Sequence, residues 1–199
     1  MRGMTGLERC MTVLNGGVAD RVPVVPQTFM FAAQTAGIKV GELAHSAVKM
    51  VEAQVVSQEK YGYDGCVIDF DDASLAEAGG AKVIFREDDP ATVDESEPAL
   101  RDLRDVGELK LPDPWRDGRL PVWLEATRLL RERLGDRGFI LGRADQGPFS
   151  LACLLRGPQQ FMMDLLDEES EAGVRALIDF CRQACALFAL AQKEAGAHA

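Results

Sequence analysis

Apolar positions along the chain follow two patterns, one typical of amphipathic helices and the other of buried strands. Apolar residues recur three or four positions apart over three long segments, residues 41–61, Leu120–Leu134 and 168–194. A shorter helix is predicted after Thr5, because Thr5 and Glu8 form an S/T-x-x-E capping box. It is expected to end near residues 15–17, where glycines permit a left-handed exit.

Short apolar runs between these segments predict β-strands. The strand candidates are residues 21–29, 66–70 and 139–144, with a further β-like run at 81–85. The run at 66–70 does not alternate, which is typical of a strand covered on both faces in a parallel sheet. Residues 86–98 are rich in Asp and Glu and contain Pro90, which predicts an exposed loop. Gly147-Pro148 predicts the start of another helix directly after the third strand.

Alternation of strands and helices predicts an α/β fold with a parallel sheet, either doubly wound or a (β/α) barrel. No dinucleotide or phosphate-binding glycine motif follows a predicted strand, which disfavours a nucleotide-binding sheet. About three βα units remain, whereas a (β/α)8 TIM barrel has eight. We therefore expect the N-terminal part of such a barrel, not closed by this chain, with residues 1–199 forming a portion of one domain.

Composition and net charge limit the kinds of molecule that the protein is expected to bind. The chain has 199 residues and a net charge of −10, which disfavours binding to nucleic acid or to an anionic membrane surface. The first ten residues lack an apolar signal core, and the apolar run at 184–191 is too short to cross a bilayer. We therefore expect a cytoplasmic protein that acts on a small-molecule substrate.

The five cysteines are scattered and odd in number, which predicts reduced thiols rather than a disulfide framework. Cys181 and Cys185 lie four positions apart on one predicted helix. Two cysteines alone do not make a zinc site, and packing of both side chains in the core is the simpler interpretation of this spacing. We expect no metal site and no cofactor within this chain.

Polar residues that follow the predicted strands are the candidates for chemistry, because TIM-barrel active sites lie at the carboxyl ends of the strands. Asp69, Asp71 and Asp72 follow the second strand; their mutual repulsion would raise at least one pKa and suit acid–base work. Alternatively, Asp71 or Asp72 caps the next helix. Residues that could orient a ligand or simply satisfy a turn follow the first and third strands: Gln27, Phe29, Gln146 and Phe149. None of these groups is a complete catalytic set.

Six short segments occur in an order that spans almost the whole chain: Asp20-Arg-Val-Pro-Val24, Glu59-Lys-Tyr-Gly-Tyr-Asp64, Glu77-Ala-Gly-Gly80, Leu111-Pro-Asp-Pro114, Asp117-Gly-Arg-Leu-Pro121 and Gly147-Pro-Phe-Ser-Leu-Ala152. In this order they resemble the uroporphyrinogen decarboxylase superfamily. The Glu-Ala-x-Gly and Asp-Gly-Arg-Leu-Pro segments look more like its methyltransferase branch, which moves methyl groups between corrinoid proteins and thiols such as coenzyme M.

The resemblance implies a single (β/α)8 barrel and a catalytic role for Asp71, which matches the family's aspartate after the second strand. The decarboxylases carry arginines after the first strand that meet the substrate's carboxylates, but here no arginine occurs between Arg21 and Arg86. A polyanionic substrate needs such guanidinium groups. The family's tyrosine after the third strand falls at Leu154. The methyltransferase branch is therefore favoured, with a corrinoid protein as the implied partner.

Two alternatives stay open. One is uroporphyrinogen decarboxylase, because Asp71 matches. The other is a non-catalytic half-barrel that needs a complementing partner and self-associates through its open sheet edge. The methyltransferases bind zinc through a His-x-Cys and a later Cys in the C-terminal half of the family fold, so zinc is expected only with that half. Substrate contacts are expected from Gln27, Phe29, Asp69, Gln146 and Phe149.

Overall fold

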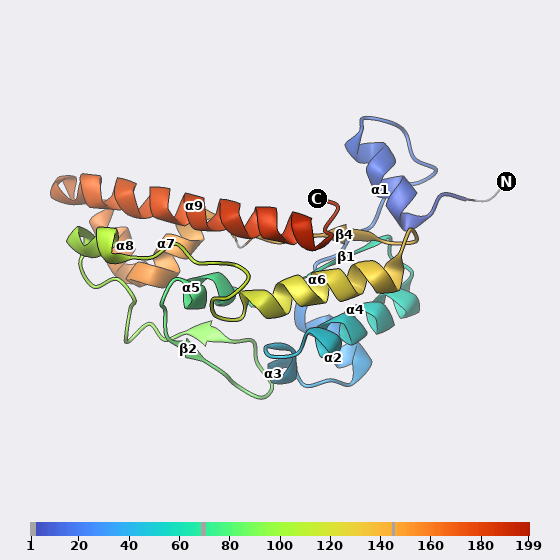
Figure 1. The fold of residues 1–199 in the computed structure, drawn as a ribbon, viewed down its shortest axis with the longest axis horizontal. Helices are drawn as coiled ribbons and strands as arrows, with labels where there is room; N and C mark the ends of the chain where they lie inside the picture. The colour runs from blue at the N-terminus through green and yellow to red at the C-terminus, as the bar shows by residue number, and fades with distance from the viewer. Residues whose placement is uncertain (1–2, 69–70, 145) are drawn as a thin grey trace.

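The computed structural model describes residues 3–68, 71–144 and 146–199, which form a mixed α/β fold with few, short strands (Figure 1). Strand β1 (Gly65–Val67) runs parallel to β4 (Phe139–Leu141), with Cys66 opposite Ile140. A second sheet pairs β2 (Val83–Ile84) with β3 (Thr92–Val93) in antiparallel fashion. The parallel sheet predicted from the unalternating run at 66–70 is therefore confirmed, and no closed barrel is present among the described residues.

Helices make up most of the structure. Their bounds are α1 Gly6–Leu14, α2 Phe29–Ala36, α3 Val40–Leu43, α4 Ala47–Tyr61, α5 Ser74–Ala78, α6 Leu120–Leu134, α7 Pro148–Arg156, α8 Pro158–Asp164 and α9 Glu171–Ala195, with 3-10 turns η1 Leu103–Glu108 and η2 Glu168–Ser170. Helix α6 packs against both α4 and α9, and α7 packs against α9 (Figure 1). No helix in the described part of the chain is both long enough and apolar enough to cross a membrane.

Several helix boundaries follow the sequence signals. The Thr5–Glu8 capping box is present at α1. Helix α6 has the predicted bounds and ends at Gly135, and α7 begins at Pro148. Helix α9 ends at Ala195, and the next residue, Gly196, caps it in a left-handed conformation with φ +115°. These boundaries are set by local chemistry, which explains why the sequence alone predicts them.

Two elements differ from the prediction. Residues 21–28 are not a strand, because Pro23 and Pro26 have no N–H to donate to a ladder. The segment joins the sheet through one backbone bond, from the Asp64 amide to the Val24 carbonyl at 2.7 Å. The helix predicted over residues 41–61 is two helices, because the Ser46 side chain caps a new helix by accepting from the Lys49 amide at 3.3 Å.

The acidic segment 86–98 is not wholly an exposed loop, since it contains β3, where Val93 is buried. Helices α2 and α8 were not anticipated; each is eight residues or shorter, too short for a clear periodic pattern. The candidate Phe29, expected to end a strand, instead begins α2.

The chain's last residues lie along the second edge of β4. The His198 amide donates to the Ile140 carbonyl at 2.9 Å, and the Gly142 amide donates to the Ala199 carbonyl at 2.8 Å. The backbone amide of Ile140 also donates to His198 Nδ1 at 2.9 Å, so this nitrogen carries no proton. Residues 197–199 thus extend the sheet by hydrogen bonds beyond β4 without forming a regular strand.

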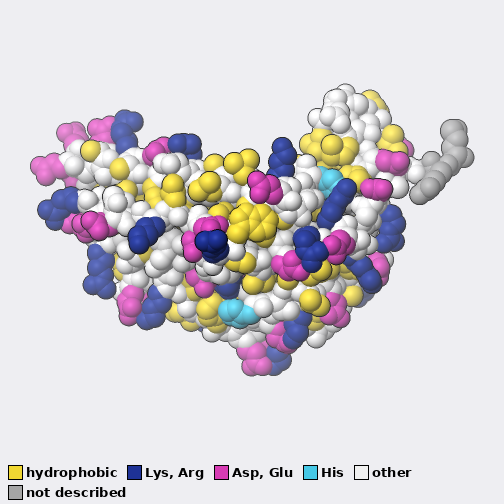
Figure 2. Space-filling view, in the orientation of Figure 1, with side chains coloured by type: hydrophobic (Ala, Val, Ile, Leu, Met, Phe, Trp, Pro, Cys, Tyr) yellow, Lys and Arg dark blue, Asp and Glu magenta, His cyan; other side chains and the backbone are white. Residues whose placement is uncertain are grey.

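One hydrophobic cluster links the helices to the sheet. Fully buried side chains contributed by α3, α4, α6, the sheet, α8 and α9 include Leu43, Met50, Leu124, Leu130, Ile140, Phe161 and Leu177. Outside this core, acidic and basic side chains are interspersed with apolar ones over the face that carries α6 and α9 (Figure 2). This is the surface of a protein whose apolar residues are mostly committed to one interior.

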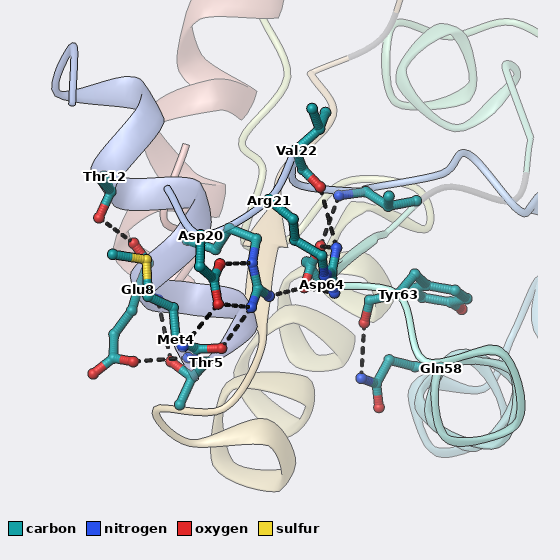
Figure 3. Close-up of polar contacts among 12 residues, drawn as sticks. Met4, Thr5, Glu8, Thr12, Asp20, Arg21, Val22, Gln58, Tyr63 and Asp64 are labelled. Carbon is teal, nitrogen blue, oxygen red and sulfur yellow. Dashed lines mark hydrogen bonds and ion pairs between the residues drawn. The ribbon is translucent and has the colours of Figure 1, made fainter. Parts of the chain in front are cut away.

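A network of ion pairs fixes the N-terminal segment at the start of β1 (Figure 3). Asp64, whose side chain is 3% exposed, receives hydrogen bonds from both Arg9 and Arg21. Its carboxylate also accepts from the Val24 amide at 2.8 Å, and Arg9 Nε donates to Asp20 at 2.6 Å. The network lies before β1, so it holds the end of the sheet opposite to the candidate site.

Candidate functional site

A pocket of about 440 Å³ opens just beyond the carboxyl end of β1. The start of α2, the loop after β1, strand β3 and helix α7 contribute its lining: Phe29, Met30, Asp71, Asp72, Ala73, Pro90, Ala91, Thr92, Val93, Glu95 and Leu154. The lining is mainly apolar, with three acidic side chains. The pocket therefore lies where the order of strands and helices predicts chemistry, and it contains the candidates Phe29 and Asp71.

Asp71 is tied to the helix that follows it. Its Oδ1 accepts hydrogen bonds from the amides of Ala73 and Ser74, both at 3.0 Å, and from the Ser74 hydroxyl at 2.9 Å. These bonds satisfy backbone donors at the start of α5, which would otherwise lack acceptors. The capping role expected for Asp71 or Asp72 therefore belongs to Asp71.

Arg119 binds the same carboxylate from the other side. Its Nη1 donates to Asp71 Oδ2 at 2.6 Å and its Nη2 to Oδ1 at 3.2 Å, while its Nε donates to Glu77 at 2.7 Å. Only 4% of the Arg119 side chain is exposed, and its guanidinium lies 5.0 Å from the ring centre of Phe85. Burial disfavours the charged guanidinium, but the hydrogen bonds and charges of Asp71 and Glu77 outweigh it and raise the pKa of Arg119.

Arg119 was not predicted as a site residue from the sequence. The signal was present in the Asp-Gly-Arg-Leu-Pro segment, in which Arg119 immediately precedes α6. What the sequence does not show is that residue 119 reaches back 48 positions to residue 71. Such a contact depends on how α6 packs beside α5, which is a tertiary property.

Asp72 faces a second arginine. Arg143 Nη2 donates to Asp72 Oδ1 at 2.6 Å, and the Arg143 guanidinium lies 5.8 Å from the centre of the Phe29 ring. Arg143 follows β4, so this contact joins the carboxyl ends of the two parallel strands. Phe29 has φ +40°, a backbone conformation that is strained for any residue other than glycine.

Comparison with known proteins identifies the family. The model of the uroporphyrinogen decarboxylase (URO-D) family matches residues 5–199. The chain belongs to the URO-D family. Among solved structures, a methyltransferase from Methanosarcina mazei matches with a TM-score of 0.85 and 23% sequence identity. A search of curated proteins gave no match.

The structural match shows that the URO-D chain shares part of a methyltransferase's fold. It covers 98% of this chain and 57% of the methyltransferase chain. The chain thus spans little more than half the length of that protein, which agrees with a sheet that is not closed into a barrel among the described residues. At this identity the match carries the fold alone.

Not every candidate of this URO-D chain lies at the pocket. Gln27, Gln146 and Phe149 are not among the lining residues, and the Phe149 ring instead packs edge-on against Phe161 at 5.5 Å. Asp69 lies outside the described residues. The pocket therefore brings together the candidates Phe29, Asp71 and Asp72 and adds Glu95.

The described residues do not fit a zinc site. They contain no group of three or more His, Cys, Asp and Glu side chains that could hold a metal ion. Four of the five cysteines are buried. Burial raises the pKa of the Cys66 thiol to about 12, which opposes the thiolate form that metal binding requires.

Proposed function

We propose that the protein containing this chain is a methyltransferase that moves a methyl group between a corrinoid protein and a thiol acceptor. The observation that carries the proposal is the pocket lining, which holds Asp71, Asp72 and Glu95 but no Lys or Arg among its described residues. A substrate with several carboxylates, such as a porphyrinogen, requires cationic partners there. Two arginines near the pocket, Arg119 and Arg143, are already bound to carboxylates of the protein.

The part of the fold described here would supply one wall of the substrate site. Asp71 accepts hydrogen bonds from Ala73, Ser74 and Arg119, so it positions the loop after β1 rather than presenting an uncommitted carboxylate. Phe29 and Leu154 add apolar surface to the same pocket. An apolar wall of this kind excludes water from a methyl group in transit.

Zinc has no place in the steps assigned to this chain, because the described residues do not form a site for it. In the methyltransferase branch that the sequence resembles, zinc would activate the acceptor thiol from the C-terminal half of the fold. We propose that the whole protein closes a (β/α)8 barrel, that residues 1–199 are the N-terminal portion of this single domain, and that it acts in the cytoplasm.

The test is an assay of the intact gene product with methylcobalamin and coenzyme M. Methyl transfer breaks the cobalt–carbon bond, leaves its electron pair on cobalt as cob(I)alamin, forms the carbon–sulfur bond and releases the thiol proton. We expect cob(I)alamin to appear in its absorbance spectrum together with the methylated thiol. Absence of both with coenzyme M and with other small thiols would reject the proposal.

Uroporphyrinogen decarboxylase remains a second candidate, favoured by the family match and by Asp71 at the family's aspartate position. Incubating the same intact protein with uroporphyrinogen distinguishes the two. Decarboxylation that is lost in Asp71→Asn would replace the methyltransferase proposal. A third candidate, a half-barrel that needs a complementing chain, is supported by the unclosed sheet and predicts activity only after a second polypeptide is added.

A further inference from the structure

A small cavity lies beneath the pocket, where α5, α6 and α9 meet the carboxyl ends of the strands. Its volume is about 10 Å³, and its lining residues are Asp71, Asp72, Ser74, Leu75, Trp123, Arg143 and Phe188. Asp71 and Asp72 line both this cavity and the larger pocket. A volume of this size is at the lower limit for one water molecule.

Trp123 contributes a buried donor to the lining. The residue is 2% exposed, and its indole N–H has no hydrogen-bond partner among the described residues. Buried indole N–H groups ordinarily find an acceptor, and leaving one unpaired costs about 1–3 kcal/mol. The edge of its ring packs against Phe188 with centroids 6.3 Å apart, so the ring cannot turn away freely.

Two carboxylates, those of Asp71 and Asp72, line the same cavity. Both oxygens of Asp71 already accept hydrogen bonds, from Arg119 on one side and from the start of α5 on the other. Asp72 accepts from Arg143 through Oδ1. A water molecule needs two to four polar partners to be stable inside a protein, and the indole N–H and the Asp72 carboxylate supply them.

We propose that this cavity binds one water molecule, which accepts a hydrogen bond from Trp123 Nε1 and donates one to the Asp72 carboxylate. The water connects α6 to the loop that forms the floor of the pocket. It thereby makes Trp123 a positioning residue for Asp72, independently of the reaction that the whole protein catalyses. The proposal rests on the cavity and on the unpaired indole, and not on the proposed methyl transfer.

The chain's two tryptophans allow an internal control, because Trp115 is 50% exposed. In protein labelled with 15N-tryptophan, we expect the Trp123 indole proton to show a nuclear Overhauser cross-peak to a long-lived water. Its exchange with solvent should be at least about tenfold slower than that of Trp115. Trp123→Phe assigns the resonance by removing it.

Three variants distinguish a bound water molecule from other sources of the signal. Ser74→Ala removes the only hydroxyl proton in the lining that could relay exchange, and the cross-peak should survive. Asp72→Ala removes the acceptor, and the cross-peak should disappear, whereas Asp72→Asn, which keeps a carbonyl acceptor, should retain it. A missing cross-peak in the parent protein, its loss in Ser74→Ala or its persistence in Asp72→Ala would each overturn the proposal. A crystal structure should place the water about 3 Å from Nε1.

Discussion

Asp71 and Asp72 are neighbours in sequence but differ in surroundings. Side-chain exposure is 2% for Asp71 and 47% for Asp72, although each is paired with an arginine. Removing one partner of a buried pair leaves an uncompensated charge, whereas an exposed pair contributes little. Substitutions at the two positions therefore test which ion pair stabilises the loop after β1 that lines the pocket.

We predict that Asp71→Asn lowers the free energy of unfolding by about 3 kcal/mol, because it leaves the buried Arg119 with Glu77 alone. Asp72→Asn should change it by less than about 1 kcal/mol. Urea denaturation followed by circular dichroism measures both. Equal losses in the two variants would show that the Asp71–Arg119 pair does not stabilise the fold.

Phe29 provides a second prediction at the residue scale. Its positive φ of +40° costs about 1–3 kcal/mol in any residue with a Cβ atom, and only glycine avoids this cost. Phe29→Gly and Phe29→Ala both lose the ring that faces Arg143. We expect Phe29→Gly to be the more stable of the two by about 1 kcal/mol, against the usual order in helices. Greater thermal stability of Phe29→Ala would mean that the backbone is not strained there.

At the scale of elements, the sequence predicts long helices better than strands. Helix α6 is correct in both bounds because fifteen residues carry a clear apolar period and Gly135 ends it. The strands have two or three residues each, too few for a periodic pattern. Residues 21–28 do not form a strand, although they are rich in valine, because the two prolines among them lack the N–H needed for a ladder.

The residues of the candidate site likewise divide into those that the sequence identifies and those that only the folded structure identifies. Asp71 could be found from its place after a strand, and Phe29 from its place at the end of the first predicted strand, although the structure shows a helix beginning there. The sequence could not identify three further residues, because their contacts join segments 42 to 71 residues apart. They are Arg119, Glu77 and Arg143, which pairs with Asp72. Sequence position suggests which residues lie at the end of a strand. Only the packing of α5 and α6 shows which basic side chains neutralise the carboxylates there.

The contact between β4 and the end of the chain should respond to pH. Burial and the nearby Arg131 lower the pKa of His198, whose Nδ1 accepts from the Ile140 amide. The neutral ring is thus favoured by folding, so its contribution is complete above the ordinary histidine pKa of 6.5 and is lost as pH falls below it. We predict that His198→Ala reduces stability at pH 7.5 more than at pH 5. An equal reduction at both, measured by urea denaturation, would contradict this.

At the scale of the whole molecule, α1 and the loop after it form a projection (Figure 1). Apolar side chains are exposed on this projection. Leu14, Val18 and Val22 are 60%, 92% and 81% exposed. Exposed apolar patches mark surfaces that associate, so we predict that the chain self-associates through this projection. Self-association through the open sheet edge, expected from the sequence, is a separate surface and stays a prediction. Sedimentation velocity should show concentration-dependent species that decrease in a Leu14→Ser, Val18→Ser variant. Val48→Ser, at an exposed position on α4, is the control and should behave as the parent.

The ion-pair network at the opposite end of the sheet ties residues 4–21 to the rest of the molecule (Figure 3). Within this network, the hydrogen bond from Arg9 lowers the pKa of the Asp20 carboxyl from 3.8 to about 2. A lowered carboxyl pKa stabilises the fold above the unfolded value and loses this contribution as pH falls toward the folded one. Acid should therefore loosen the N-terminal segment between about pH 4 and pH 2.

We predict that Asp20→Asn reduces stability at pH 6 and that its difference from the parent shrinks as pH falls from 4 to 2, since the parent's own carboxyl is then protonated. Urea denaturation across this range measures the difference. Asp136→Asn, at a 95% exposed carboxylate that lies 4.0 Å from its nearest arginine, is the control and should match the parent at every pH. A difference between Asp20→Asn and the parent that stays constant down to pH 2 would mean that Asp20 acts through its shape rather than its charge.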